Sequence, residues 1–238
     1  MIHRKSIKIA LGLLVFITLP SLLFFGFIYF KYQADLPIGT QGEQAELLAA
    51  KMLEALDYKA FQETKYIEWT YKNRRHYKWQ KDKQICTVYW KEYKVALNLK
   101  DYETSKAYVH NFEVKGEKGQ NLIAKAIDFY NNDSFWLIAP YKVYDEGVER
   151  RLVKNDLGKD ALLVTYTSGG STPGDSYLWQ FNKDGKPTKF KMWVSSLPID
   201  GIEASWTDWT TTESGAQLPT NHNILFFSFD MGDVKGTF

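Results

Sequence analysis

The sequence predicts an α+β fold: a large curved antiparallel sheet, or an unclosed β-barrel, with two packing helices, preceded by one N-terminal transmembrane helix. An uncharged apolar run of 22 residues covers positions 9–30. Two later stretches repeat apolar residues at helical spacing, and many short stretches alternate apolar and polar residues between turn signals. Many antiparallel strands accompanied by a few helices are typical of an α+β domain.

The apolar run 9–30 would span roughly 33 Å as a helix, at about 1.5 Å per residue, which matches the hydrocarbon core of a bilayer. Arg4, Lys5 and Lys8 precede it, so the positive-inside rule places residues 1–8 in the cytoplasm. The run is longer than the apolar core of a secretory signal, and no small-x-small cleavage site ends it. We expect a single-pass signal anchor in the inner membrane, with the following domain in the periplasm. A cleaved signal peptide and a buried soluble helix are the alternatives.

The charge balance of the remaining chain is nearly neutral. Without Arg4, Lys5 and Lys8, 27 Lys and Arg residues stand against 28 Asp and Glu residues. A nearly neutral domain lacks the excess of basic residues that nucleic-acid binding requires. The single cysteine, Cys86, cannot form an internal disulfide, and we expect it to be a small buried apolar residue rather than a nucleophile. The aromatic fraction of 16% favours strands and large apolar surfaces.

Residues 31–43 contain one proline and two glycines and are predicted to be a short linker. A single domain is predicted over 44–238, and it begins with an amphipathic helix over 44–58. Packing of this helix on the domain is favoured over its lying on the membrane. A second helix is predicted over 118–130 from the spacing of its apolar residues, which are Leu122, Ile123, Ala126, Ile127 and Tyr130.

Strands are predicted wherever the apolar period changes to two, first at Ile67, Trp69 and Tyr71 and then at Tyr77 and Trp79. The other predicted strands lie at 85–90, 95–97, within 101–114, 135–139, 148–153, 161–167, 177–181, 188–194, 202–210 and 224–229. Pro140 is expected to end the strand 135–139. Several of these strands are apolar on both faces, which predicts a sheet covered on both sides, by a helix on one and by a cavity or ligand on the other.

The order of these elements, together with the phrases DSFWLIAPYK (133–142) and NKDGKP (182–187), resembles the LolA/LolB-like lipoprotein-carrier superfamily. The resemblance covers 44–238 and is strongest to the poorly characterised, outer-membrane-sorting-like relatives. It implies an unclosed antiparallel barrel, with helices as a lid, that holds acyl chains in an apolar concavity. A chain that keeps a transmembrane anchor cannot shuttle between membranes, so the resemblance implies apolar-ligand binding rather than the carrier role.

Aromatic and apolar side chains of the strands and of the segment after the second helix are the candidate ligand-binding residues. Three interpretations compete for the aromatic ones: plain core, the wall of an apolar ligand cavity, and an exposed platform that stacks on sugars. The candidates are Trp69, Tyr71, Trp79, Trp90, Trp136, Trp179, Phe190, Met192 and Trp193.

Catalytic and metal-binding motifs are not found in the sequence. His3, His76, His110 and His222 are isolated, without H-x-x-H or H-E-x-x-H spacing. The loop SGGSTPGD (168–175) has no Gly-Lys-Ser/Thr ending and precedes a predicted strand, so a long hairpin loop is favoured over a phosphate-binding loop.

The sequence therefore predicts a membrane-anchored binding protein, not an enzyme, that holds a lipid or acyl group and needs no metal or other cofactor. The membrane and the acyl ligand are its expected partners, nucleic acid is not, and no protein partner is predicted. A carbohydrate-binding or envelope-scaffolding module is the alternative.

Overall fold

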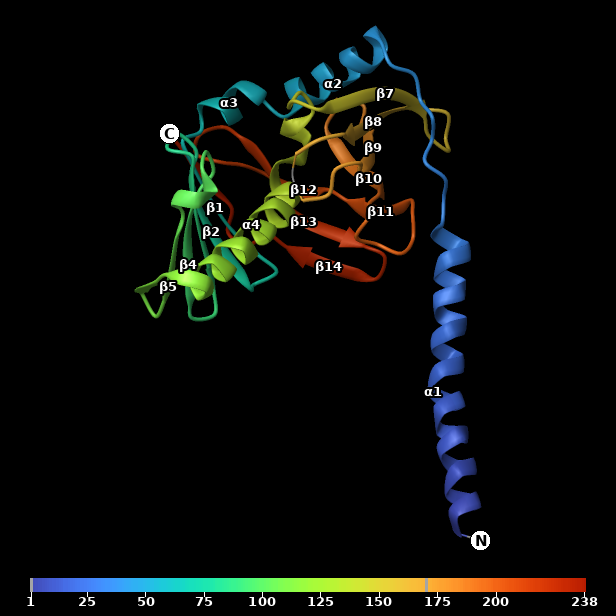
Figure 1. Cartoon of the computed structure of the whole chain (residues 1–238). Coiled ribbons are helices and arrows are strands. Elements are labelled where there is room, and N and C mark those ends of the chain that lie inside the picture. The colour runs from blue at the N-terminus through green and yellow to red at the C-terminus, as the bar shows by residue number, and fades with distance from the viewer. Residues whose placement is uncertain (1, 170) are drawn as a thin grey trace.

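The computed structural model describes residues 2–169 and 171–238 and begins with a long helix, α1 (Ile2–Tyr32). Within the described chain, it is the helix long and apolar enough to cross a membrane, by length and composition alone. It extends away from the rest of the protein and is almost fully exposed along its length (Figure 1). These properties fit either a membrane anchor or a signal sequence.

The rest of the chain is an α+β domain with two large antiparallel sheets that do not close into a barrel, as predicted. The first sheet has the strand order β15-β1-β2-β3-β4-β5-β6. Its strands are β1 (Tyr66–Tyr71), β2 (Arg75–Gln80), β3 (Ile85–Trp90), β4 (Tyr93–Asn98), β5 (Lys106–Val109), β6 (Phe112–Val114) and β15 (Lys235–Thr237). Alternate residues of β1 and β3 are buried, which confirms the predicted period of two.

The second sheet has the strand order β12-β13-β11-β10-β9-β8-β7, and β14 pairs with β13. Its strands are β7 (Val148–Lys154), β8 (Asp160–Tyr166), β9 (Ser176–Phe181), β10 (Pro187–Trp193), β11 (Ile202–Ser205), β12 (Thr207–Thr211), β13 (Gln217–Ile224) and β14 (Phe227–Asp230). The two sheets meet where the chain leaves β14, because Met231 accepts a hydrogen bond from the Thr70 amide of β1 at 2.8 Å.

The sequence pattern did not predict β13 and β15, and two of the predicted strands join segments that the structure separates. The predicted strand 224–229 is wrong, because β13 ends at Ile224 and a two-residue turn leads into β14, with Ile224 opposite Phe227. The predicted strand 202–210 is two strands, β11 and β12, which pair separately with β13.

Three α-helices and two short 3-10 turns complete the domain. The predicted helix 44–58 is α2 (Glu43–Ala55), which buries Ala45, Ala49, Met52 and Leu53. It is followed by a short separate helix, α3 (Tyr58–Glu63), whose N-terminus is capped by the side chain of Asp57. The 3-10 turns are η1 (Tyr102–Thr104) and η2 (Ala139–Lys142).

The predicted second helix is longer than expected, since α4 runs over Gly116–Ile138. The predicted strand 135–139 is therefore wrong: Phe135–Ile138 continue the helix, and Pro140 lies in η2. Helix α4 packs against β4 and β5 of the first sheet and against β13 of the second. It lies across the space between the two sheets (Figure 1).

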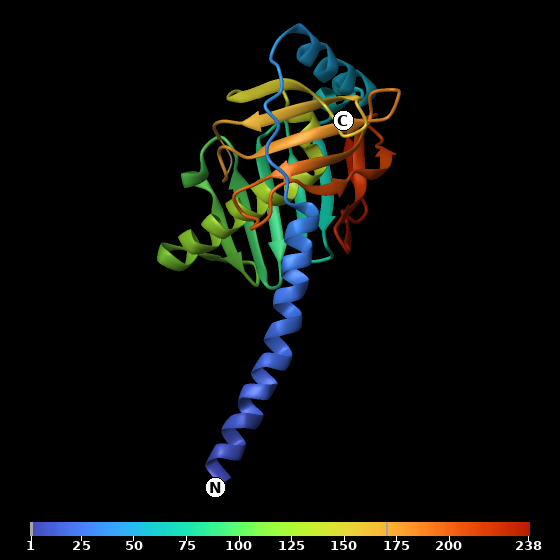
Figure 2. The same ribbon diagram turned by 90° about the vertical axis from the view of Figure 1, so that its right-hand side faces the viewer.

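Residues 33–42, which we call the strap, run in contact with the outer face of the second sheet (Figure 2). The Trp193 indole donates to the Ala34 carbonyl at 2.8 Å, and Thr40 pairs with Leu152 of β7. The outer residues of this sheet, Ala161, Leu163, Leu178 and Trp193, form a small apolar cluster of their own. The second sheet is therefore covered on both faces, but the sequence predicted a cavity or ligand as the second cover, and the structure has the strap there.

Candidate functional site

The candidate site is the aromatic interior between the second sheet and the C-terminal half of α4. We call it the inter-sheet cluster; it consists of Trp136, Tyr177, Trp179, Phe190, Trp206, His222 and Phe229. Trp136 of α4 lies at its centre, with its ring centroid 5.2 Å from that of His222 and 5.1 Å from that of Phe229. Trp206 lies 4.9 Å from Trp179 and 4.8 Å from His222. Edge-to-face contacts of this kind order aromatic rings relative to one another.

A second group of aromatic rings lies on the inner face of the first sheet, next to the middle of α4. Trp69 and Tyr77 stack with their centroids 4.5 Å apart and their planes within 7°. Trp79 lies 6.0 Å from Tyr130 of α4, and Trp90 lies 5.5 Å from Phe129. Helix α4 is thus lined by aromatic side chains from its middle to its C-terminal end.

Five buried polar side-chain atoms of this interior make no hydrogen bond within the described chain. They are the Nε1 atoms of Trp69, Trp79, Trp179 and Trp206 and the Nε2 atom of His222. A buried donor without a partner costs about 1–3 kcal/mol, so several in one interior are unusual and call for an explanation.

His222 is fully buried and neutral. Its Nδ1 lies 3.0 Å from the Ser205 carbonyl, so Nδ1 carries the proton and Nε2 keeps the lone pair. Burial lowers the pKa of His222 to about 4, although the backbone carbonyls of Ser205 and Trp136 oppose this effect. His222 therefore acts as a polar but uncharged part of the cluster at neutral pH.

A buried ion pair fixes α4 to the first sheet. Arg75 of β2 donates from Nε to Oδ2 of Asp133 at 2.5 Å and from Nη2 to Oδ1 at 2.9 Å. The Tyr77 hydroxyl also donates to Oδ2. Partial burial disfavours the Arg75 cation, but the hydrogen bond and charge of Asp133 outweigh it and raise the pKa of Arg75. Burial, followed by the charge of Asp133, raises the pKa of Tyr77.

The structure divides the nine predicted ligand-binding residues into two faces. Eight belong to the main core between the sheets: Trp69, Tyr71, Trp79, Trp90, Trp136, Trp179, Phe190 and Met192. Trp193 lies on the outer face of the second sheet, under the strap. Within the described residues no tryptophan is exposed, so none forms the sugar-stacking platform that the sequence left open.

Four members of the inter-sheet cluster were not among the candidates predicted from the sequence: Tyr177, Trp206, His222 and Phe229. His222 had no local motif around it, and Phe229 was assigned to a strand that does not exist in the predicted form. His222 and Phe229 share one signal, which is their pairing across the β13–β14 hairpin, where they lie opposite each other. That pairing could not be read without the turn at Leu225 and Phe226.

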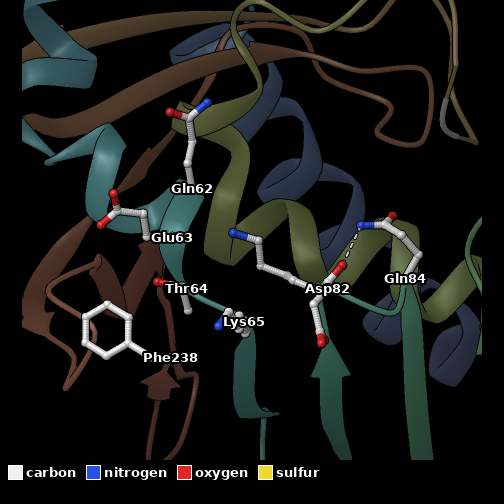
Figure 3. A pocket seen from close by; sticks show the side chains of 8 residues that line it. Gln62, Glu63, Thr64, Lys65, Asp82, Gln84 and Phe238 are labelled. Atoms are coloured by element: carbon white, nitrogen blue, oxygen red, sulfur yellow. Dashed lines mark hydrogen bonds between the residues drawn. The ribbon is translucent and has the colours of Figure 1, made fainter.

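An open pocket of about 530 Å³ lies elsewhere, at the edge of the first sheet (Figure 3). Acidic, basic and amide side chains line it, together with Phe238. Burial lowers the pKa of Lys81, which lines the pocket, to about 8, but its ammonium group is already held by the Phe61 carbonyl. The structure of the described chain contains no group of three or more His, Cys, Asp or Glu side chains that could hold a metal ion.

Comparison with known proteins gives a likeness in structure but none in sequence. No protein-family model matches the sequence, and no curated protein matches it. The crystal structure of a DUF1329 family protein from Desulfovibrio piger ATCC 29098 is similar in structure, with a TM-score of 0.41 and 10% identity. The likeness covers 82% of this chain and 94% of the other. The resemblance to the LolA/LolB-like superfamily stays a prediction, and no function is carried over.

Proposed function

We propose that this protein is anchored in the inner membrane by α1 and binds a lipid or acyl ester between its two sheets in the periplasm. The observation that carries the proposal is the set of unpaired indole N–H groups inside an aromatic interior. The mechanism is burial and release of the ligand, and no catalytic step is part of it.

Membrane anchoring is supported by the composition of α1. Its apolar side chains from Ile7 to Phe30 are largely exposed in the protein alone, and a bilayer would cover them. The basic residues at its N-terminal end favour a cytoplasmic N-terminus, which puts the domain on the opposite side.

The chemistry of the interior indicates the class of ligand. An indole N–H is a donor only, so the four unpaired indoles can be satisfied only by acceptor atoms. Their surroundings are aromatic rings and aliphatic side chains, which favour an apolar ligand body at about 0.8 kcal/mol for each buried CH₂ group. A fatty acyl ester combines an apolar chain with carbonyl oxygens that accept hydrogen bonds, and it therefore fits both requirements.

Ligand entry requires α4 to move, because Trp136 of this helix contacts Phe190, His222 and Phe229 directly. The Arg75–Asp133 ion pair lies close to Trp136 along the same helix and holds it against the first sheet. We propose that the ligand enters under the C-terminal half of α4. The ion pair would stay formed and keep the helix attached to the first sheet while this half moves.

The experiment is photo-crosslinking of the full-length protein in phosphatidylethanolamine–phosphatidylglycerol vesicles that contain a phospholipid with a diazirine on one acyl chain. Mass spectrometry then maps the crosslinked peptides. We expect crosslinks in α1, in the peptide that contains Trp136 and in the strands that carry Trp179 and Trp206. Crosslinks confined to α1 would show an anchored protein that binds no lipid, and their absence from α1 would contradict the anchor.

Replacing tryptophan by phenylalanine, at sites with an unpaired and with a paired N–H group, tests the role of the indole N–H groups. Replacing Trp179 and Trp206 together by Phe removes two unpaired donors. It should reduce crosslinking of the interior roughly thirtyfold, since two lost hydrogen bonds at about 1 kcal/mol each weaken binding by about 2 kcal/mol. Trp193→Phe is the matched control, because its N–H group is already paired with Ala34. It should lower stability and leave crosslinking unchanged. Equal effects of both changes would contradict the proposed role.

A further inference from the structure

We infer that the tip of the β13–β14 hairpin, Phe226 and Phe227, inserts into the same bilayer as α1 and is a second membrane contact of the domain. The inference rests on the proposed membrane anchoring. It commits to the lipid bilayer as the partner of this surface, and it adds an orientation that the anchor alone does not give.

The hairpin tip is apolar and exposed. The side chains of Phe226 and Phe227 are 62% and 70% exposed. The next cross-strand pair, Asn223 and Ser228, is polar and exposed, so the apolar character is confined to the tip. A short apolar tip on a polar stem is suited to shallow insertion at a membrane interface.

The turn itself is built from unusual residues. Leu225 has a φ of 52°, in the left-handed region where glycine, asparagine and aspartate are favoured at hairpin turns. A leucine there is strained, and a phenylalanine follows it. The turn therefore presents apolar side chains at a position where polar or small residues would be easier to accommodate.

The tip lies beside the membrane-spanning part of α1. The ring of Phe226 is 6.2 Å from that of Phe24, and Phe24 belongs to the predicted span 9–30. Phe24, Phe25 and Phe27 of α1 are each more than half exposed, so the tip and the helix form one continuous apolar surface. Leu157, in the turn between β7 and β8, is an exposed apolar residue of another part of the domain.

Hydrogen bonds at the end of α1 fix this arrangement. The Ala34 amide donates to the Asp200 carbonyl at 3.1 Å, and the Asp200 amide donates to Oε1 of Gln33 at 3.0 Å. Asp200 lies just before β11, which pairs directly with β13 at Ala204 and Ile224. The anchor, β11 and the hairpin are thus connected by short links, and the tip is held at the depth of Phe24.

The orientation has a consequence for the inter-sheet cluster. His222 and Phe229 of that cluster lie on the two strands of the same hairpin. A tip in the bilayer places the cluster close to the membrane surface, from which an acyl ligand would come.

The test uses single-cysteine labelling of the full-length protein in phosphatidylethanolamine–phosphatidylglycerol vesicles. Cys86 is fully buried and stays in place, and protein without an added cysteine checks that it does not react. The variants Phe226→Cys and Phe227→Cys are labelled with the fluorophore NBD, which is quenched by doxyl groups on lipid chains or by iodide in water. Leu157→Cys is the matched exposed control, and Leu14→Cys is the reference within α1.

We expect doxyl lipids to quench the labels at 226 and 227 about threefold more strongly than the label at 157, as at an interfacial depth. Quenching by iodide should show the reverse order. If the label at 14 is lipid-quenched while those at 226 and 227 respond only to iodide, the inference is overturned and the anchor stands. If the label at 14 is not quenched by doxyl lipids, both the proposed membrane anchor and the inferred insertion of the hairpin tip are overturned. Labels at 226 and 227 shielded from both quenchers would indicate a protein contact and would also overturn the inference.

Discussion

Arg75 and Asp133, 58 residues apart in the chain, form a two-point ion pair that joins β2 to α4, with Nε–Oδ2 and Nη2–Oδ1 distances of 2.5 and 2.9 Å. Asp133 is fully buried, whereas the Arg75 side chain keeps 19% of its surface. Aromatic side chains make up most of the contact between α4 and the first sheet, and this ion pair is a polar interaction within it. The ion pair determines which face of α4 packs against the sheet.

Replacing Asp133 by alanine should lower the free energy of unfolding by about 3–5 kcal/mol, because the Arg75 cation would remain partly buried without its partner. Urea unfolding followed by tryptophan fluorescence measures this change. Glu63→Ala is the control, since Glu63 pairs with Lys59 on the surface at 3.8 Å and should contribute no more than about 0.5 kcal/mol. A loss below about 1 kcal/mol for Asp133→Ala would show that the ion pair does not hold α4.

His222 makes the stability of the domain depend on pH. Burial lowers its pKa from 6.5 to about 4, so between these values the unfolded chain binds a proton that the folded chain does not. Stability should therefore fall by up to about 3 kcal/mol as pH decreases from 6.5 to 4, and His222 should have no effect above 6.5.

Comparison of His222→Gln with the unaltered protein isolates this contribution, and His110→Gln, at an exposed turn, is the control. The pH dependence of urea unfolding should become flatter for His222→Gln over this range and stay unchanged for His110→Gln. An unchanged slope in His222→Gln would mean that His222 is charged in the folded protein.

Cys86 should be unreactive until the first sheet opens. It is fully buried in β3, where it lies opposite Trp79 and Leu97, and burial raises the pKa of its thiol. Labelling by a maleimide should be about 10³-fold slower than for an exposed thiol, because it requires the opening of a core strand. Labelling at the rate of an exposed thiol would contradict the burial predicted from the sequence.

The fold class could be predicted because alternation in strands such as β1 and β3 is a local property of the chain. The segment 135–139 shows where local patterns fail. A short apolar run ended by a proline fits a strand and a buried helix equally well. Its conformation is helical because α4 already extends through Asp133, whose partner Arg75 is far away in the sequence.

The burial of the candidate residues could be predicted for a similar reason, whereas their role in ligand binding stays a prediction. Eight of the nine candidates face the interior, since the alternation of each strand separates its two faces. Trp193 follows Met192 and therefore lies on the opposite face of β10, with Lys189 and Lys191. Its burial there could not be predicted, because the strap that contacts it has no apolar pattern of its own. The hairpin turn at Leu225 and Phe226 contains neither glycine nor asparagine, so it has none of the residues from which a two-residue turn is predicted.

Close packing of the strap on β7 leads to a prediction that separates steric contact from backbone strain. Gly39 and Gly158 have similar positive φ angles, 64° and 71°. A Cβ atom at Gly39 would lie 2.8 Å from Cβ of Arg151 and from Cγ2 of Val153, whereas nothing lies within 4 Å of a Cβ at Gly158. Substitution by alanine should lower the free energy of unfolding by about 1 kcal/mol at either site, because of backbone strain. At Gly39 the substitution should lower the free energy of unfolding by roughly a further 1–3 kcal/mol, because the added methyl group overpacks the contact with β7.

The readout for Gly39→Ala is cleavage within the strap by endoproteinase Asp-N, which cuts before Asp35, beside the unfolding free energy. The bridge between Thr40 and Leu152 should weaken, so cleavage should become faster in Gly39→Ala while Gly158→Ala stays as resistant as the unaltered protein. Equal cleavage of the two variants would mean that the strap is not held by its contact with β7. The domain would then hang from the membrane on a flexible linker, and the orientation inferred for the β13–β14 hairpin would rest on the bonds of Gln33 and Ala34 alone.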